Sequence, residues 1–171
     1  MNNEDFDNFY ANIYKLAYIT RYSGIPRIKN ESVAEHSFFV ASLVVKLHES
    51  YDFDIGTALQ MAITHDWAEA FIGDITHVTK INYPEIGQAA HEAEKEAIKQ
   101  FAPRVYSLLC KYNNQSSVEA KVVAMADVIQ VAQYAENEVK LGNTGYMIDV
   151  ANSAYTRLEQ LKEQLNEYKR Q

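Results

Sequence analysis

Apolar residues recur at intervals of three and four along most of the chain, which is the spacing of one buried face of an α-helix. A first helix is predicted from residues that have this spacing, namely Phe6, Phe9, Tyr10, Ile13, Leu16 and Ala17. A second helix is predicted to begin after Ser32, because Ser32 and Glu35 have the spacing of a capping box. Its expected buried stripe is Phe39, Val40, Leu43, Val44 and Leu47.

The middle of the chain continues this pattern. A third helix is predicted from about Asp54 and is expected to run on toward Phe71, with an inward face formed by Ile55, Leu59, Ala62 and Ile63. Gly73 is a typical helix stop, and residues 74–84 are predicted to form a loop. Residues 85–100 are rich in Ala, Glu and Lys, which indicates a helix that faces solvent.

Three further signals complete the predicted fold. Pro103 stands where a helix can begin, Ser117 can cap a helix that runs to about Leu141, and the segment 142–145 breaks that helix. A last helix is expected over about residues 146–168. With only 6 Gly and 3 Pro in 171 residues, long helices are favoured over many short strands. The prediction is an all-α fold of about six or seven helices that forms a single domain over residues 1–171.

Composition narrows the classes of function. The chain has 16 Lys and Arg against 23 Asp and Glu, a net charge of −7, so a nucleic-acid polymer is not expected as the main partner. No apolar run approaches the roughly 18 residues of a membrane span, and the acidic N-terminus lacks the apolar core of a signal peptide. One cysteine allows neither an intrachain disulfide nor a cysteine-rich zinc site. We therefore expect a cytoplasmic protein with no membrane partner.

Polar side chains interrupt three of the predicted apolar helix faces. His36 lies in the second helix, His65 and Asp66 lie in the third, and Asp127 lies in an apolar segment of a later helix. A carboxylate is costly to bury unless it is paired or bound to a metal. Two imidazoles and two carboxylates suit a divalent transition metal with positions left open for water and substrate. Glu69 is expected on the same helix face as His65, one turn further on.

Other interpretations of these residues stay open on spacing alone. The imidazoles and carboxylates could form a buried hydrogen-bonded cluster without metal. Arg21 could be a surface arginine at a helix end, and Lys80 could be exposed in the same way. Tyr22 could be a half-buried aromatic side chain with no role in a site.

The order His, His-Asp and Asp resembles that of the HD-domain metal-dependent phosphohydrolases. The local sequence is similar to their 5′-deoxynucleotidase branch, the YfbR-like enzymes. The similarity is carried by Arg21-Tyr22, by 31–37 (ESVAEHS), by 65–69 (HDWAE) and by 73–76 (GDIT), followed by Lys80. It extends from about residue 6 to residue 140, and its motifs are more specific for the branch than for the substrate.

This resemblance implies an all-helical HD-domain fold, a homodimer or larger homo-oligomer, and one divalent metal. Cobalt or manganese is expected, with magnesium, zinc and iron as alternatives. The residues that match the family's metal ligands are His36, His65, Asp66 and Asp127. Arg21 matches a phosphate-binding arginine, Glu69 matches the acidic catalytic residue, and Asp74 matches a second acid at the substrate.

The chain departs from the family's pattern at the expected substrate site. The branch often has Trp after the arginine, where this chain has Tyr22, so sugar selectivity can differ. The bacterial enzymes often read GDLPTPVK where this chain reads GDITHVTK at 73–80. Both prolines are therefore absent, and His77 occupies the usual threonine position. Tyr22, His77 and Lys80 are the expected substrate contacts, with Lys80 as a second positive charge for the phosphate.

The expected function is metal-dependent removal of the 5′-phosphate from (deoxy)nucleoside monophosphates, with Glu69 as the general acid for the sugar 5′-oxygen. The alternative within the same chemistry is a deoxynucleoside triphosphate hydrolase, for example one acting on dATP. In that case Arg21, Lys80 and Lys111 would hold the longer phosphate chain. A third interpretation is a non-enzymatic helical module that binds a nucleotide or a partner protein. The intact ligand set and Glu69 argue against it.

Overall fold

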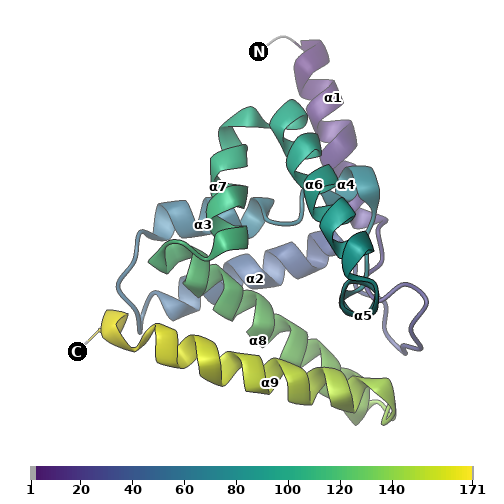
Figure 1. Cartoon of the computed structure of the whole chain (residues 1–171), viewed down its shortest axis with the longest axis vertical. Helices are drawn as coiled ribbons and strands as arrows, with labels where there is room; N and C mark the ends of the chain where they lie inside the picture. Colours follow the sequence, from purple (N-terminus) through teal and green to yellow (C-terminus); the bar gives the residue numbers. More distant parts are fainter. Residues whose placement is uncertain (1–2, 171) are drawn as a thin grey trace.

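A computed structural model describes residues 3–170, and these residues are predominantly helical (Figure 1). The helices are α1 (Asn3–Tyr14), α2 (Val33–Leu47), α3 (Ile55–Thr64), α4 (Glu69–Ile72), α5 (His77–Asn82), α6 (Pro84–Phe101), α7 (Pro103–Asn114), α8 (Val118–Lys140) and α9 (Tyr146–Gln164), with the 3₁₀ turns η1 (Lys15–Ala17) and η2 (Asn166–Tyr168). Seven of the α-helices described have ten or more residues, which confirms the predicted all-α fold of six or seven helices. Within this range no helix combines the length and apolar character needed to cross a membrane.

Side-chain caps set where several helices begin. The Ser32 hydroxyl accepts a hydrogen bond from the Glu35 N–H at 3.2 Å, and the Glu35 carboxylate accepts one from the Ser32 N–H at 2.8 Å. This capping box pairs backbone groups that the start of α2 would otherwise leave unpaired. Asp54 and Ser117 cap α3 and α8 through one side-chain oxygen each, and Pro103 is the first residue of α7. The predicted starts of these four helices are confirmed.

The main apolar core lies between α2, α3, α8 and α9. Its buried side chains include Val40, Val44, Met61, Ala62, Val122, Val123, Leu158 and Leu161. α8 and α9 lie side by side, and α2 and α3 both pack against α8 (Figure 1). Removing this apolar surface from water is the principal stabilising contribution. α8 is therefore central, and side chains that it directs toward α2 and α3 are enclosed.

Part of the predicted inner face of α2 and α3 is wrong. Phe39 is 47% exposed and Ile63 is 49% exposed, close to Phe38, which is 67% exposed. The buried residues of α2 are instead Val33, His36, Ser37, Val40 and Val44. α2 carries apolar residues on more than one side, so residue type alone does not indicate which side faces the core.

The third predicted helix ends earlier than expected. α3 ends at Thr64, residues 65–68 form turns, and α4 begins at Glu69. The His65 side chain bonds to the last turn of α3, because its Nδ1 lies 2.8 Å from the Ala62 carbonyl oxygen. The expectation that His65 and Glu69 share one face of a continuous helix is therefore wrong.

The predicted loop at 74–84 is also partly helical. Gly73 ends α4 with a φ of 78°, a conformation that glycine adopts without strain. The Thr76 hydroxyl then accepts a hydrogen bond from the Thr79 N–H at 3.4 Å and caps α5. This local cap starts a short helix of six residues where the apolar pattern was too short to indicate one.

A buried carboxylate near the end of α8 anchors the loop that precedes α2. Glu138 is 1% exposed. Its two oxygens accept hydrogen bonds from the backbone N–H groups of Ile28 and Lys29, both at 2.7 Å. The Asn143 amide adds a third donor at 3.0 Å. Burial opposes the ionised form, but these donors outweigh it and hold the pKa of Glu138 below its ordinary value.

We expect Glu138→Gln to lower the free energy of unfolding by about 1–3 kcal/mol at neutral pH, because hydrogen bonds to a charged acceptor are weakened or lost. A pKa that is depressed in the folded state gives stability that is present above the ordinary value of 4.5. That stability is lost as the pH falls through the folded value. Urea denaturation of both proteins should therefore show a smaller difference at about pH 3 than at neutral pH. An equal difference at both pH values would contradict this role.

Candidate metal and phosphate site

Four of the predicted side chains meet in the interior. They are His36 in the first turns of α2, His65 at the end of α3, the adjacent Asp66, and Asp127 on α8. His36 Nε2 lies 3.3 Å from Asp127 Oδ1 and 3.5 Å from Asp66 Oδ2. His65 Nε2 lies 3.1 Å from the same Asp66 oxygen. Residues that are distant in the sequence thus face a common point.

This arrangement fits one divalent cation. One donor atom each from His36, His65 and Asp127 lie within 4.8 Å of one another, and Asp66 Oδ2 is next to both imidazoles. Because His65 Nδ1 faces the Ala62 carbonyl, its hydrogen points there, and Nε2 is the ring nitrogen left to face the other donors. That Nε2 is buried, and its 3.1 Å contact with Asp66 Oδ2 lacks the geometry of a hydrogen bond. Imidazole nitrogen and carboxylate oxygen together suit a transition metal.

The charges of the cluster also favour a cation. Burial opposes ionisation of Asp127, but the hydrogen bond and charge of His36 hold its pKa at about 2. Burial likewise opposes ionisation of Asp66, but its contact with His65 keeps its pKa well below the ordinary value. Burial disfavours the charged form of His65, yet the two carboxylates raise its pKa to about 9. Two carboxylates that stay ionised here require positive charge nearby, which protonated His65 supplies in this structure and which a divalent metal would supply in its place.

A tyrosine outside the predicted site holds Asp127 in place. Tyr112 of α7 donates its hydroxyl to Asp127 Oδ2 at 2.9 Å, and its ring lies edge-on to His65 with the centroids 5.3 Å apart. Burial and the charges of Asp127 and Asp66 raise the pKa of Tyr112 well above its ordinary value, so the hydroxyl stays a donor. The other Asp127 oxygen is left to face His36.

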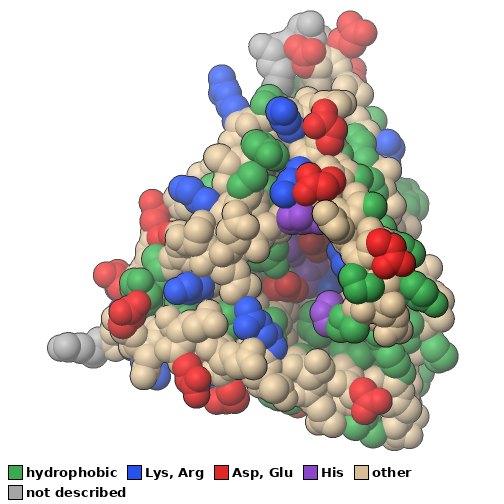
Figure 2. All heavy atoms as spheres, viewed as in Figure 1, with side chains coloured by type: hydrophobic (Ala, Val, Ile, Leu, Met, Phe, Trp, Pro, Cys, Tyr) green, Lys and Arg blue, Asp and Glu red, His purple; other side chains and the backbone are tan. Residues whose placement is uncertain are grey.

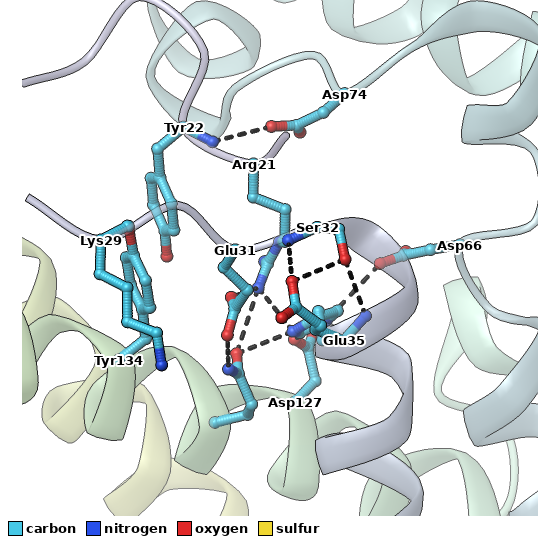
Figure 3. Close-up of polar contacts among 12 residues, drawn as sticks. Arg21, Tyr22, Lys29, Glu31, Ser32, Glu35, Asp66, Asp74, Asp127 and Tyr134 are labelled. Carbon is cyan, nitrogen blue, oxygen red and sulfur yellow. Dashed lines mark hydrogen bonds and ion pairs between the residues drawn. The ribbon is translucent and has the colours of Figure 1, made fainter. Parts of the chain in front are cut away.

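Arg21 contacts His36 at Nδ1, the ring nitrogen that does not face Asp66 and Asp127. It belongs to the network of polar side chains shown in Figure 3. Its Nη1 is 3.2 Å from Glu31 Oε2 and 3.1 Å from Gln130 Oε1. The same nitrogen is 2.5 Å from His36 Nδ1. The Arg21 side chain is 15% exposed, so it is not the surface arginine that its sequence position alone allowed.

Tyr22 has a left-handed backbone conformation, with a φ of 58°. Its N–H donates to Asp74 Oδ2 at 3.1 Å, and its ring stacks on Tyr134 of α8 with the centroids 5.1 Å apart (Figure 3). The guanidinium carbon of Arg21 lies 5.4 Å from the centre of the Tyr22 ring. A positive φ is costly for a residue with a side chain, and the contacts of Tyr22 with Asp74 and Tyr134 offset the cost. Asp74 therefore shapes the loop that carries Arg21.

A cavity of about 200 Å³ opens beside the predicted metal ligands. It is lined by His65, Asp66, Ala68, Glu69, Lys80, Glu94, Tyr112 and Asn113. Figure 2 shows the hollow on this face, with histidine and acidic side chains at its floor and around its rim. Glu69 Oε2 and Asn113 Nδ2 are buried there without a hydrogen-bond partner in the described part of the chain. Burial, followed by the charges of Asp66 and Asp74, raises the pKa of Glu69 to about 9.

The structure places the two remaining predicted substrate contacts differently. Lys80 lines the cavity, where its Nζ is 3.3 Å from Glu94 Oε1. His77 is exposed at the start of α5 and does not belong to the cavity lining found in the described residues. Lys80 is thus close to the metal ligands, whereas His77 is separate from them.

Sequence reasoning missed several side chains of this site, namely Glu31, Tyr112, Asn113 and Gln130. Two of them carried a positional signal. Glu31 begins the motif at 31–37, and Gln130 follows Asp127 by about one helical turn, so both share a region with a predicted ligand. Tyr112 is one of 12 tyrosines and had no such signal.

Known proteins resemble the chain over much of its length. The 5′-deoxynucleotidase PM0747 of Pasteurella multocida (strain Pm70) is 31% identical over 172 residues, which covers 90% of this chain and 83% of that protein. The human 5′-deoxynucleotidase HDDC2 is 30% identical over 124 residues, which covers 66% of this chain and 58% of that protein. The chain thus spans about three fifths of the length of the HDDC2 proteins that it matches.

The fold is shared with solved structures as well. The PH0347 protein from Pyrococcus horikoshii OT3 is similar with a TM-score of 0.79 and 27% sequence identity, over 95% of this chain and 92% of that chain. The family model described as 5′-deoxynucleotidase YfbR-like matches residues 8–169, which is nearly the whole chain. The resemblance inferred from the motifs is therefore confirmed, and the chain belongs to the YfbR-like 5′-deoxynucleotidase family.

Proposed function

We propose that the protein is a metal-dependent 5′-nucleotidase that removes the 5′-phosphate from nucleoside monophosphates, with deoxyribonucleotides preferred. One observation carries this proposal. The side chains of His36, His65, Asp66 and Asp127 meet beside a cavity whose lining also holds Glu69 and Lys80. Hydrolysis of a phosphate ester needs these three elements together: a cation at the phosphoryl group, a proton donor for the leaving oxygen, and further positive charge for the phosphate.

We propose that His36, His65, Asp66 and Asp127 hold one divalent metal. Cobalt or manganese is expected, with magnesium, zinc or iron as alternatives. The mixture of nitrogen and oxygen donors supports a transition metal. When bound, such a metal lowers the pKa of a water ligand and draws charge from the phosphoryl oxygens.

Arg21 and Lys80 are the proposed phosphate-binding residues. The planar guanidinium of Arg21 can hold two phosphoryl oxygens at once, which a lysine does not reproduce. Its position beside His36 supports this role, because a phosphate near the metal ligands would lie within its reach. Lys80 lines the cavity and would exchange its partner Glu94 for a phosphoryl oxygen.

Glu69 is the proposed general acid. A sugar 5′-oxygen leaves poorly unless it receives a proton. Glu69 Oε2 is buried at the cavity without a partner in the described part of the chain, so it is free to donate to a substrate oxygen. The raised pKa of Glu69 keeps its carboxyl group protonated near neutral pH, which supports the same role.

The sugar and base contacts form the remaining part of the proposal. Asp74 holds the Tyr22 backbone through Oδ2, and we assign its other oxygen to a sugar hydroxyl or to a water molecule. The Tyr22 ring, fixed against Tyr134, is the proposed neighbour of the sugar. His77 is proposed as an outer contact at α5, where it is exposed to an incoming substrate.

We further propose that residues 1–171 form one domain, with the motifs at about 6–140 and the C-terminal helix at about 146–168, and that it works in the cytoplasm. The burial of Leu158 and Leu161 of α9 in the same core as α2, α3 and α8 supports a single unit. Free nucleotides, the proposed substrates, are cytoplasmic metabolites.

A homodimer or larger homo-oligomer is also proposed, with an apolar groove formed by α1, η1, α2, α3 and the turn after α3 as the contact surface. The groove is lined by Ile13, Leu16, Ala34, Ser37, Phe38, Ala41, Ile63 and Trp67. Contiguous exposed apolar side chains mark interaction surfaces. A second copy of the chain is the proposed occupant, in line with the assembly that the sequence resemblance implies.

A screen of substrates and metals tests the activity. Protein freed of metal by a chelator is supplied in turn with Co²⁺, Mn²⁺, Mg²⁺ and Zn²⁺ and mixed with deoxynucleoside monophosphates, ribonucleoside monophosphates or deoxynucleoside triphosphates. We expect release of inorganic phosphate and a nucleoside from the deoxynucleoside monophosphates. Turnover of triphosphates alone would support the alternative hydrolase. Metal binding without any turnover would support a non-enzymatic binding module.

Glu69→Ala is expected to lose about 10²–10⁴-fold in turnover while keeping its metal, because proton donation is removed and the ligand set is intact. Turnover is measured by phosphate release, and bound metal by elemental analysis of the purified protein. Glu163→Gln on the exposed side of α9 is the control and should behave as wild type. A fully active Glu69→Ala protein would remove Glu69 from the mechanism.

The assembly is tested by light scattering after size-exclusion chromatography. We expect wild type to have at least twice the chain mass of 19.5 kDa. The double variant Phe38→Glu with Ile63→Glu should have the mass of one chain, because charges would be buried in the groove contact. Leu141→Glu, at an exposed apolar residue outside the groove, should leave the mass unchanged. A monomeric wild type would contradict the proposal.

A further inference from the structure

One buried amide on α8 contacts both halves of the proposed site. Gln130 is 5% exposed and lies about one helical turn after Asp127. Its Oε1 is 2.7 Å from His36 Nδ1 and 3.1 Å from Arg21 Nη1. Its Nε2 donates to Glu31 Oε1 at 2.5 Å. Figure 3 shows two of these partners, Arg21 and Glu31, in the loop before α2.

The partners of Gln130 fix which way its amide points. The Glu31 carboxylate can only accept, so the amide nitrogen must face it and the amide oxygen must face His36 and Arg21. That oxygen can only accept, whereas Arg21 Nη1, 2.5 Å from the same His36 Nδ1, can only donate. We assign the Nδ1 hydrogen to the amide oxygen, because an imidazole that binds a metal through Nε2 carries its hydrogen on Nδ1. His36 Nε2 is then the ring nitrogen that faces Asp127 Oδ1, at 3.3 Å, and that would bind the metal. The amide oxygen thus accepts the Nδ1 hydrogen of the form of His36 that can bind a metal.

We infer that Gln130 is a positioning residue that presents His36 to the metal and Arg21 to the phosphate through one amide oxygen. This inference rests on the metal site and on the role of Arg21 proposed above. Two other ligands have supporting partners that serve one ligand each, the Ala62 carbonyl for His65 and the Tyr112 hydroxyl for Asp127. Gln130 differs because it joins a metal ligand to the arginine.

Glu31 completes the same unit. Its Oε1 holds the amide of Gln130, and its Oε2 lies 3.2 Å from Arg21 Nη1. Glu31 is 5% exposed, so bulk water does not compete for the hydrogen bonds that its two oxygens accept. The carboxylate therefore fixes both the orientation of the amide and the position of the guanidinium.

A purely structural role for Gln130 leads to a different expectation. If the side chain only filled space in α8, an apolar residue of similar volume would leave metal affinity unchanged. If it positions His36, removal of the amide oxygen leaves the His36 Nδ1 hydrogen without its acceptor in a buried place. The imidazole is then free to turn or to exchange its hydrogen between the two nitrogens, and metal affinity must fall.

The first test is Gln130→Met, which removes the oxygen and keeps the volume. We expect the affinity of chelator-treated protein for Mn²⁺ or Co²⁺, measured by isothermal titration calorimetry, to fall by about 10–100-fold. Gln133→Met, on the exposed side of the same helix, is the matched control and should bind the metal as wild type does. Thermal unfolding of the metal-free proteins shows whether Gln130→Met is folded. A folded Gln130→Met with wild-type affinity would overturn the inference.

The second test swaps the carboxylate and the amide between positions 31 and 130, as the double variant Glu31→Gln with Gln130→Glu. The net charge is unchanged, position 130 can still accept from His36 and Arg21, and position 31 can now supply the donor between them. We expect metal affinity at or above that of wild type, and a KM for a deoxynucleoside monophosphate close to that of wild type. A double variant that binds the metal about tenfold or more weakly than wild type would overturn the inference, and this test stands even if Gln130→Met does not fold.

The titration of wild type separates this inference from the proposed function. If wild type binds no divalent metal, the proposed function fails. If wild type binds metal and Gln130→Met binds it equally well, only the role of Gln130 fails.

Discussion

The burial of two ionised carboxylates beside two imidazoles is the constraint on which the rest of the structure depends. The Asp66 and Asp127 side chains are only 21% and 26% exposed, and this loss of hydration destabilises each ion unless opposite charge and hydrogen bonds replace it. The replacement comes from different elements, with His36 on α2, His65 at the end of α3 and Tyr112 on α7. These helices must therefore keep their relative positions, and the apolar core that joins them fixes the geometry of the candidate cation site.

The irregular segment before α2 is held as firmly as the helices. Backbone N–H groups of this segment bond to Glu138, the Tyr22 ring stacks on Tyr134, and the Tyr22 N–H bonds to Asp74. Most of these supports are side chains of the segment's neighbours rather than its own secondary structure. A loop fixed in this way holds the Arg21 side chain in one place, which would lower the entropy cost of binding the proposed phosphate.

Sequence patterns predicted the features that depend on local or strongly unfavourable choices. Caps such as Ser32 are local, and a histidine or aspartate within an apolar stripe is costly enough to indicate a purpose, as at His36 and Asp127. The break at 65–68 was not predictable, because it depends on where the His65 ring finds its partner. Gln130 and Tyr112 were missed for a related reason. Their residue types are common, and only the contacts made across the fold distinguish them.

Four side chains that serve the site follow one another along a single face of α8. Asp127, Gln130, Tyr134 and Glu138 are separated by three, four and four residues. They contact in turn His36, Arg21, the Tyr22 ring and the loop backbone. A deletion or insertion of one residue early in α8 would rotate all four by about 100° at once. The number of residues in the early part of α8 therefore cannot change by even one without the loss of these contacts. The turn at 142–145 beyond the helix has no such constraint from these four side chains.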